Sequence, residues 1–182
     1  MRNFVLYSLL LMLMAGVFTA CGNRADVNKV NNTEEETETV PEVKPEKAET
    51  LPAMQLRDQQ GKTVMLSSLK GKRVFLNLWA TWCPPCVAEL PSIETLYKKT
   101  TNADQNAFLI VSLDDEFSTA KKFMQRKGYT FPIYEVVGNM PEMFNVPGIP
   151  ATFVFNTEGN LVFKHIGMND YSKRRFLQMM QP

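Results

Sequence analysis

Two cysteines separated by two prolines constrain this 182-residue chain more than any other feature. Residues 82–86 read Trp-Cys-Pro-Pro-Cys. A disulfide needs Cα atoms roughly 4.4–6.8 Å apart, and one helical turn brings residues i and i+3 within that range. We therefore expect Cys83 and Cys86 to form a reversible disulfide that transfers electrons.

The residues around the pair predict a turn from a strand into a helix. Residues 74–80 form an apolar run rich in strand formers, which indicates a buried central strand. Pro84 and Pro85 suit the first turn of a helix, where a missing N–H costs little. We expect this helix to continue to Lys99.

The two cysteines are expected to have different roles. At a helix N-terminus, free N–H groups and the helix dipole stabilise a thiolate, so the pKa of Cys83 should fall from about 8.5 towards about 7. Cys86 lies one turn deeper and should keep a higher pKa. We expect Cys83 to attack substrate disulfides and Cys86 to resolve the mixed disulfide.

Two other interpretations of the cysteines are less favourable. A structural zinc site usually needs four Cys or His ligands, and the whole chain contains Cys21, Cys83, Cys86 and His165. A static disulfide over so short a loop would constrain the unfolded chain little. We therefore predict redox chemistry and no metal ligands.

The first 21 residues predict export and lipid attachment. Arg2 precedes an apolar stretch at residues 4–18, as in a secretory signal. Residues 18–22, Phe-Thr-Ala-Cys-Gly, resemble a bacterial lipobox in which Cys21 becomes acylated. The alternative is an uncleaved membrane anchor, but the stretch is shorter than the ~20 residues of a typical span. We expect a protein of the cell envelope, facing the periplasm and lipid-anchored to a membrane, where disulfides can persist.

Composition divides the remainder of the chain into a linker and one domain. Residues 22–50 lack aromatic residues, contain an acidic run at 33–39, and are predicted to be a disordered acidic linker. Residues 51–182 are sufficient for one domain with its own core. With 20 basic and 19 acidic residues and no basic stripe, the chain offers nothing for nucleic acid.

Strand and helix signals alternate along this domain, which predicts an α/β fold with a mixed sheet. Strands are expected at residues 63–66, 74–80, 107–113, 131–137, 152–156 and 161–164. Helices are expected at residues 84–99, 118–127, 141–144 and 172–180, with Gly128 ending the second.

With these features in order, the domain resembles the thioredoxin superfamily. Residues 77–91, Asn-Leu-Trp-Ala-Thr-Trp-Cys-Pro-Pro-Cys-Val-Ala-Glu-Leu-Pro, are similar to the TlpA/ResA group of exported, membrane-anchored thiol-disulfide oxidoreductases. The resemblance implies a thioredoxin-like fold with a mixed central sheet flanked by helices and an inserted segment before a cis-proline. It also implies protein thiols or disulfides as substrates, no cofactor, and a membrane electron-donor protein. A reductant role, as in cytochrome c maturation, is the direction it favours.

The resemblance assigns substrate contacts to three residues. Pro150 matches the family's cis-proline, and the backbone of Ile149 would dock an extended substrate peptide. Without the resemblance, a trans turn proline would be the ordinary interpretation. Trp82 would flank Cys83 as an apolar contact surface, whereas Trp79 is expected in the core.

Glu89 matches a glutamate that this group keeps near its cysteines. A carboxylate there would raise thiol pKa values and could exchange a proton with Cys86. The alternative is a solvent-facing acid that complements the helix dipole. Asn77 stands where thioredoxin has a buried acid, which leaves Glu89 as the candidate.

Two other functions remain open at this point. A thioredoxin-fold copper metallochaperone would use the two cysteines with His165, although we expect that imidazole to be structural. A peroxiredoxin-like peroxidase would need a Pro-x-x-x-Thr-x-x-Cys pattern, which the residues before Cys83 lack.

Overall fold

The computed structural model describes residues 49–100, 102 and 104–181. The predicted lipid attachment at Cys21 and nearly all of the predicted linker lie outside these residues. Glu49 and Thr50, at the end of the expected linker, already contact the domain: the Glu49 carbonyl accepts a hydrogen bond from Leu161 N, and Thr50 forms an antiparallel bridge with Asn160. Within the described part, no helix is long and apolar enough to cross a bilayer.

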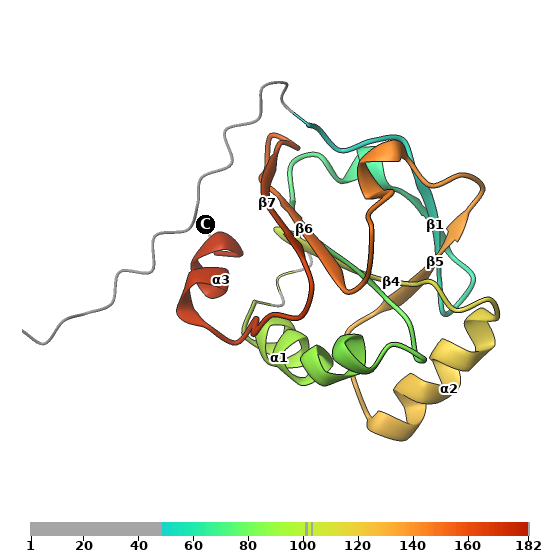
Figure 1. The fold of residues 1–182 in the computed structure, drawn as a ribbon. Helices are drawn as coiled ribbons and strands as arrows, with labels where there is room; N and C mark the ends of the chain where they lie inside the picture. Colours follow the sequence, from blue (N-terminus) through green and yellow to red (C-terminus); the bar gives the residue numbers. More distant parts are fainter. Residues whose placement is uncertain (1–48, 101, 103, 182) are drawn as a thin grey trace, which may run out of the picture. The chain divides into compact units, whose positions relative to one another are not determined.

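One mixed sheet organises the described domain (Figure 1). Its strands lie in the order β2-β1-β5-β4-β3-β6-β7. β3, β4 and β5 are parallel to one another, whereas β1, β2, β6 and β7 pair antiparallel with their neighbours. The bounds are β1 (Gln55–Asp58), β2 (Thr63–Met65), β3 (Arg73–Trp79), β4 (Asn106–Ser112), β5 (Ile133–Val137), β6 (Ala151–Phe155) and β7 (Leu161–Ile166).

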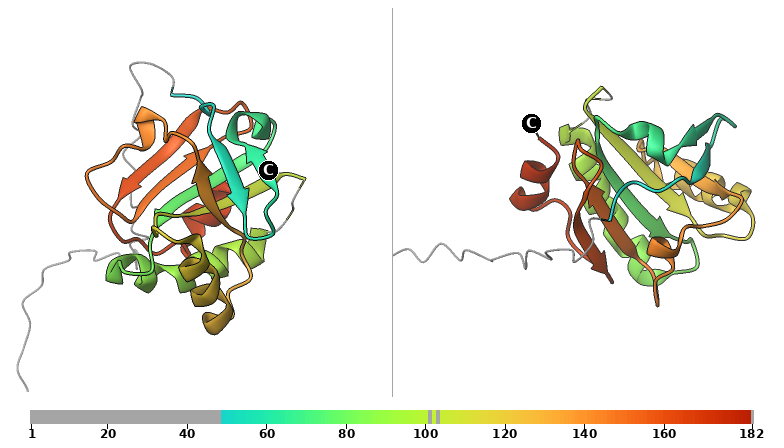
Figure 2. Two further views of the ribbon diagram at one scale, coloured as in Figure 1. Left: turned by 90° about the vertical axis from the view of Figure 1, so that its right-hand side faces the viewer. Right: turned by 90° about the horizontal axis from the view of Figure 1, so that it is seen from above.

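Helical elements lie on both faces of this sheet (Figures 1 and 2), and an apolar core fills each side. The first core joins the sheet to α1 (Pro84–Thr100), α2 (Phe117–Lys127) and α3 (Arg174–Met179). The second lies under the short 3-10 helices η1 (Leu66–Leu69) and η2 (Glu142–Phe144). Because side chains alternate along a strand, neighbouring residues of β3 belong to different cores.

β3 lies at the centre of the fold and leads directly to the cysteines. It pairs along its whole length with β4 and from Val74 to Leu78 with β6. Its residues from Val74 to Trp79 are buried, which agrees with the apolar run in the sequence. α1 starts five residues after β3 ends, so the cysteine pair sits at the carboxyl edge of the central strands.

The α/β thioredoxin-like fold expected from the sequence is confirmed, with differences at individual elements. β1 was not predicted, because it is an edge-side strand of four residues with only Leu56 fully buried. Leu66 begins η1 instead of extending β2. α2 ends at Lys127 with Gly128 as its C-cap, as expected, and the φ of 70° at Gly128 explains the glycine.

Candidate redox site

Cys83 and Cys86 form a disulfide at the beginning of α1. Their Cα atoms are 5.3 Å apart, within the range that one helical turn allows. The pairing expected from the spacing is therefore confirmed. This geometry shows the disulfide itself; its redox role depends on the accessibility of the two sulfurs and on the groups around them.

Cys83 occupies the N-cap position of α1. Its carbonyl accepts the first helical hydrogen bond, from Val87 N at 3.1 Å. The backbone N–H of Cys86 points at Cys83 Sγ, with N and Sγ 3.3 Å apart. Pro84 and Pro85 have no N–H, so in this first turn the Cys86 amide is the donor that reaches the sulfur.

Exposure differs among the residues of the motif. Cys86 is fully buried, Cys83 retains 5% exposure, and the preceding Trp82 is 66% exposed. Trp79 is completely buried, as expected for a core residue. An incoming sulfur can therefore approach Cys83 beside the Trp82 indole, while Cys86 is reached through Cys83.

The peptide bond between Ile149 and Pro150 is cis, which confirms the expectation for this proline. The carbonyl oxygen of Ile149 lies 3.7 Å from Cys83 Sγ. The Pro150 carbonyl accepts a hydrogen bond from Gly167 N, which ties the turn to the end of β7. The structure thus brings the backbone of Ile149 and the more exposed cysteine together.

Glu89 is buried one helical turn after Cys86, at 2% exposure, so the solvent-facing alternative is wrong. Its Oε1 accepts a hydrogen bond from Asn77 Nδ2 at 2.8 Å, and its Oε2 accepts one from Asn169 N at 3.1 Å. Burial raises the pKa of Glu89 to about 7, although both hydrogen bonds oppose the shift. A carboxyl group with this pKa can both take and give a proton near neutral pH.

A buried polar network extends from Glu89 into β6 and the segment before α3. Asn77 Nδ2 also donates to Thr152 Oγ1, and the Tyr171 hydroxyl donates to the same oxygen at 2.6 Å. Asn77 and Thr152 are direct cross-strand partners in β3 and β6. Thr152 and Tyr171 were not predicted from the sequence; a polar residue in the apolar run 151–155 was the available signal for Thr152.

Asp114 was also missed, and it shapes the loop that precedes Cys83. Its carboxylate accepts hydrogen bonds from the backbone N–H and the hydroxyl of Thr81, and from the hydroxyl of Ser112. β3 and β4 are parallel, so their carboxyl ends meet here, as the Trp79–Ser112 pairing shows. The carboxylate therefore connects the end of β4 to the loop between β3 and α1.

His165 lies on β7, opposite Thr152 and stacked against Phe163 with ring centroids 6.2 Å apart. In residues 49–100, 102 and 104–181, no three His, Cys, Asp or Glu side chains gather as a metal site. The structure therefore does not join His165 to the cysteine pair, as the copper metallochaperone alternative would require.

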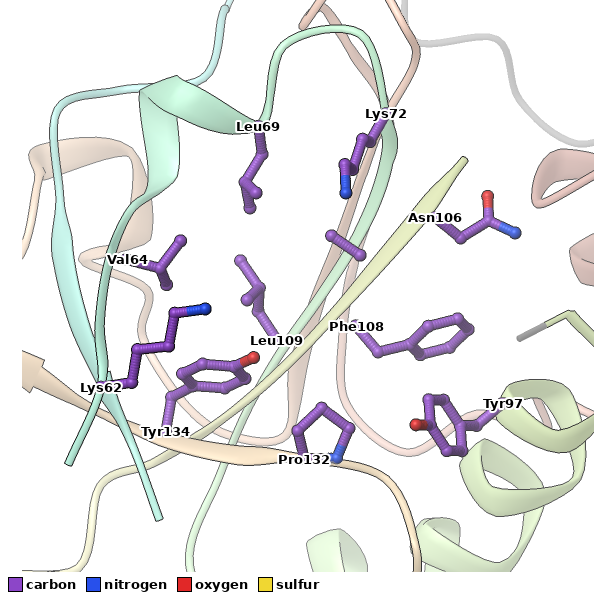
Figure 3. Close-up of a pocket in the computed structure, with 11 residues that line it drawn as sticks. Lys62, Val64, Leu69, Lys72, Tyr97, Asn106, Phe108, Leu109, Pro132 and Tyr134 are labelled. Atoms are coloured by element: carbon purple, nitrogen blue, oxygen red, sulfur yellow. The ribbon is translucent and has the colours of Figure 1, made fainter. Parts of the chain in front are cut away.

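Two cavities of similar size have different relations to the cysteines. A groove of about 350 Å³ lies beside Trp82 and Ile149. Another cavity of about 350 Å³ lies at the amino end of β4, where Lys62 and Lys72 direct their amino groups into it (Figure 3). Neither cysteine lines either cavity, but the first contains Trp82, which precedes Cys83, and Ile149, whose carbonyl oxygen lies 3.7 Å from Cys83 Sγ. We therefore assign the redox site to the first region.

Comparison with known proteins agrees with this geometry. The Redoxin family model matches residues 45–176. The thiol-disulfide oxidoreductase ResA of Halalkalibacterium halodurans is 33% identical over 129 residues, covering 70% of this chain and 73% of the relative. ResA of Bacillus subtilis is 35% identical over 112 residues, covering 61% of this chain and 62% of the relative. The crystal structure of an exposed lipoprotein thioredoxin from Streptococcus pneumoniae is 28% identical with a TM-score of 0.59, covering 71% of this chain and 98% of that one.

Proposed function

The chain belongs to the Redoxin family and is a TlpA/ResA-like protein thiol-disulfide oxidoreductase, and on this premise we propose that it is an exported reductant acting through Cys83 and Cys86. The observation that carries this proposal is the disulfide at the N-cap of α1, with Cys83 as its more accessible sulfur. The cis-Pro150 turn beside that sulfur supports it.

In the proposed reaction, the reduced enzyme transfers two electrons to a substrate disulfide. The Cys83 thiolate attacks one substrate sulfur, the substrate S–S bond breaks, and one substrate thiolate leaves. Cys86, deprotonated, then attacks Cys83 Sγ, which forms the Cys83–Cys86 disulfide and releases the second substrate thiolate. The two departing thiolates take up two protons. A separate thiol donor must reduce the enzyme again.

Glu89 is proposed to accept the proton that Cys86 loses in the second step. Glu89 and Cys86 are three residues apart on α1 and therefore share a face of that helix. Because burial raises its pKa to about 7, Glu89 is a stronger base than an exposed carboxylate while still ionising near neutral pH. The side-chain amide of Asn77 and the backbone N–H of Asn169 hold the carboxyl group in place.

Pro85 supports the reducing direction. A site becomes a strong oxidant when its reduced form is stabilised, as in DsbA. Thiolate stabilisation at a helix N-terminus depends on N–H groups of the second and third helical positions, which are aimed at the sulfur, and Pro85 removes the one at the second position. The Cys83 thiolate is thus less stabilised than in a motif with an N–H group at this position, which favours giving electrons away.

Export, lipid attachment and the physiological partners belong to the same proposal. Residues 1–21 carry the signal and lipobox pattern ending at Cys21. The pneumococcal relative is named as an exposed lipoprotein, which supports a similar location here. We place the domain in the cell envelope, facing the periplasm, with a membrane protein as electron donor and apocytochrome c among the substrates.

Trapping of mixed disulfides tests the proposed function. Cys86→Ala should accumulate substrates covalently attached to Cys83, because the resolving thiol is absent, and they should be released by dithiothreitol. Cys83→Ala is the matched control and should trap far fewer. Equal trapping by the two variants, or none by Cys86→Ala, would contradict the assigned roles. A measured potential near that of DsbA, about −120 mV, would contradict the reducing direction.

A further inference from the structure

The groove that contains Trp82 and Ile149 is mostly apolar and is adjacent to the redox site. Trp82 precedes Cys83 in the chain, and the Ile149 carbonyl oxygen lies 3.7 Å from Cys83 Sγ. Most of the remaining wall comes from the segment between β5 and β6. The groove is lined by Leu78, Trp82, Leu113, Met140, Glu142, Phe144, Asn145, Val146, Gly148 and Ile149. A side chain of a bound protein, adjacent to its reactive cysteine, could occupy this space.

The charged residue that lines the groove and the charged residues that follow its lining residue Leu113 in the chain are all acidic. Glu142 lines the groove and is exposed, and exposed Asp115 and Glu116 follow soon after its lining residue Leu113. Asp114 is not counted among the charges that could face a partner, because its carboxylate already accepts hydrogen bonds from Thr81 and Ser112.

Basic residues are missing from the stretches of chain that build the groove. Residues 74–97, 109–120 and 128–163 contain every lining residue and no Lys, Arg or His, although the chain has 20 Lys and Arg in total. The first basic residue after each of these stretches has a partner: Lys98 pairs with Glu94, and Lys121 and Lys164 lie over the rings of Phe117 and Phe153. The segment between β7 and α3 carries one charge of each sign, Asp170 and Lys173, so its net charge is zero. Neither residue lines the groove.

We propose that this groove and its acidic rim, Asp115, Glu116 and Glu142, form a docking surface for a basic protein segment. The occupant is the stretch around the partner's reactive cysteine, with an apolar side chain in the groove and Lys or Arg side chains facing the rim. This proposal rests on the proposed function and adds the chemical class of its substrate. Exposed charges act chiefly on association rates and are screened by salt, so selectivity should appear in the second-order rate constant at low ionic strength.

Three disulfide-bonded peptides and one small disulfide provide the test. Two peptides have a Leu next to cysteine and carry either two flanking Lys or two flanking Glu. The third is the Lys peptide with Leu replaced by Ser. The small disulfide is 2-hydroxyethyl disulfide, which is neutral. Rates are measured with the reduced protein by stopped-flow tryptophan fluorescence.

We expect the Lys peptide to react about tenfold faster than the Glu peptide at low ionic strength, with the ratio falling as salt is added. The Ser peptide should react more slowly than its Leu counterpart. Asp115→Lys combined with Glu142→Lys should make the Glu peptide react faster than the Lys peptide. Because the two rate constants are compared as a ratio, a general change in thiol reactivity cancels. Asp104→Lys with Glu158→Lys makes the same change in net charge at the opposite end of the sheet and should keep the preference.

Two results would overturn the docking surface: a wild-type protein that reduces 2-hydroxyethyl disulfide but treats Lys and Glu peptides alike, or a control pair that changes the ratio as much as the rim pair. Failure to reduce 2-hydroxyethyl disulfide and all three peptides would instead contradict the proposed function itself.

Discussion

The two faces of the paired strands β3 and β6 have opposite character. On the helix-covered face, Asn77 and Thr152 lie side by side and hydrogen-bond within a network that includes Glu89 and Tyr171. On the other face, Leu76 pairs with Phe153 in an entirely apolar cluster. Both faces are buried, so the difference is not one of exposure to water.

This contrast separates stability from chemistry within two strands. A buried carboxyl group costs stability when it is charged, because desolvation penalises the ion. The apolar face contributes burial without such a cost. Glu89 is such a carboxyl group, and it lies on the helix-covered face one turn from Cys86. A role in the reaction explains why the chain keeps it there. Changes on the two faces should therefore have different consequences.

The largest expected effect on stability lies on the apolar face. Phe153 is fully buried and packs edge-on against Phe144, with ring centroids 4.9 Å apart. Phe153→Ala should lower the free energy of unfolding by about 3–5 kcal/mol, because it leaves a cavity. Urea unfolding measures this loss, and Phe153→Leu should recover much of it. The reduction potential of the folded variant should match the wild type; a shifted potential would break the separation of the two faces.

Glu89→Gln should change the pH dependence of both stability and rate. The pKa of Glu89 is about 7 in the folded state against an ordinary value of 4.5. Between these values the folded protein binds more protons than the unfolded chain, so the wild-type free energy of unfolding should fall by about 3 kcal/mol as pH rises from below 4.5 to above 7. The variant should lack this fall, as measured by urea unfolding across pH.

The same variant tests the proton transfer to Glu89. The wild-type rate of resolution by Cys86 should show an inflection near pH 7, and the variant should be slower without that inflection. Unchanged pH profiles for both stability and resolution would contradict the assignment of a raised pKa and a proton-transfer role.

Thr152→Val should have a smaller effect on the polar face. The substitution keeps the shape of the side chain and removes the oxygen that accepts hydrogen bonds from Asn77 and Tyr171. Leaving two buried donors with fewer partners should cost about 1–2 kcal/mol in the free energy of unfolding. Thr152→Ser, which retains the hydroxyl, should lose less. If both variants lose the same amount, packing of the methyl group is responsible instead of the hydrogen bonds.

The smallest expected change is in reduction potential, through Pro85→Ala. The substitution adds a backbone N–H in the first turn of α1, where it can join the Cys86 amide in pointing at Cys83 Sγ. Stabilisation of the thiolate should lower the pKa of Cys83 and raise the potential by roughly 10–30 mV. Equilibration with glutathione measures the shift. Pro91→Ala adds an N–H farther along the same helix and should leave the potential unchanged.

Local patterns in the chain predicted most of the elements and the cysteine geometry. The apolar run of β3 and the two prolines identified the strand-to-helix turn, and the Cys spacing predicted the disulfide. The same reasoning missed β1, because a four-residue strand with one fully buried side chain carries little periodic signal. It also missed Asp114, because its partner Thr81 is 33 positions earlier in the chain.

The sequence by itself therefore determined the redox motif, the fold class and the family, because each follows from local patterns and their order along the chain. Tertiary structure alone decided that Glu89 is buried against Asn77, that Thr152 and Tyr171 complete the network, and that Glu142 shares a groove with Trp82. These relations join residues from different strands and helices. Burial, which raises the pKa of Glu89, exists only after those elements have packed.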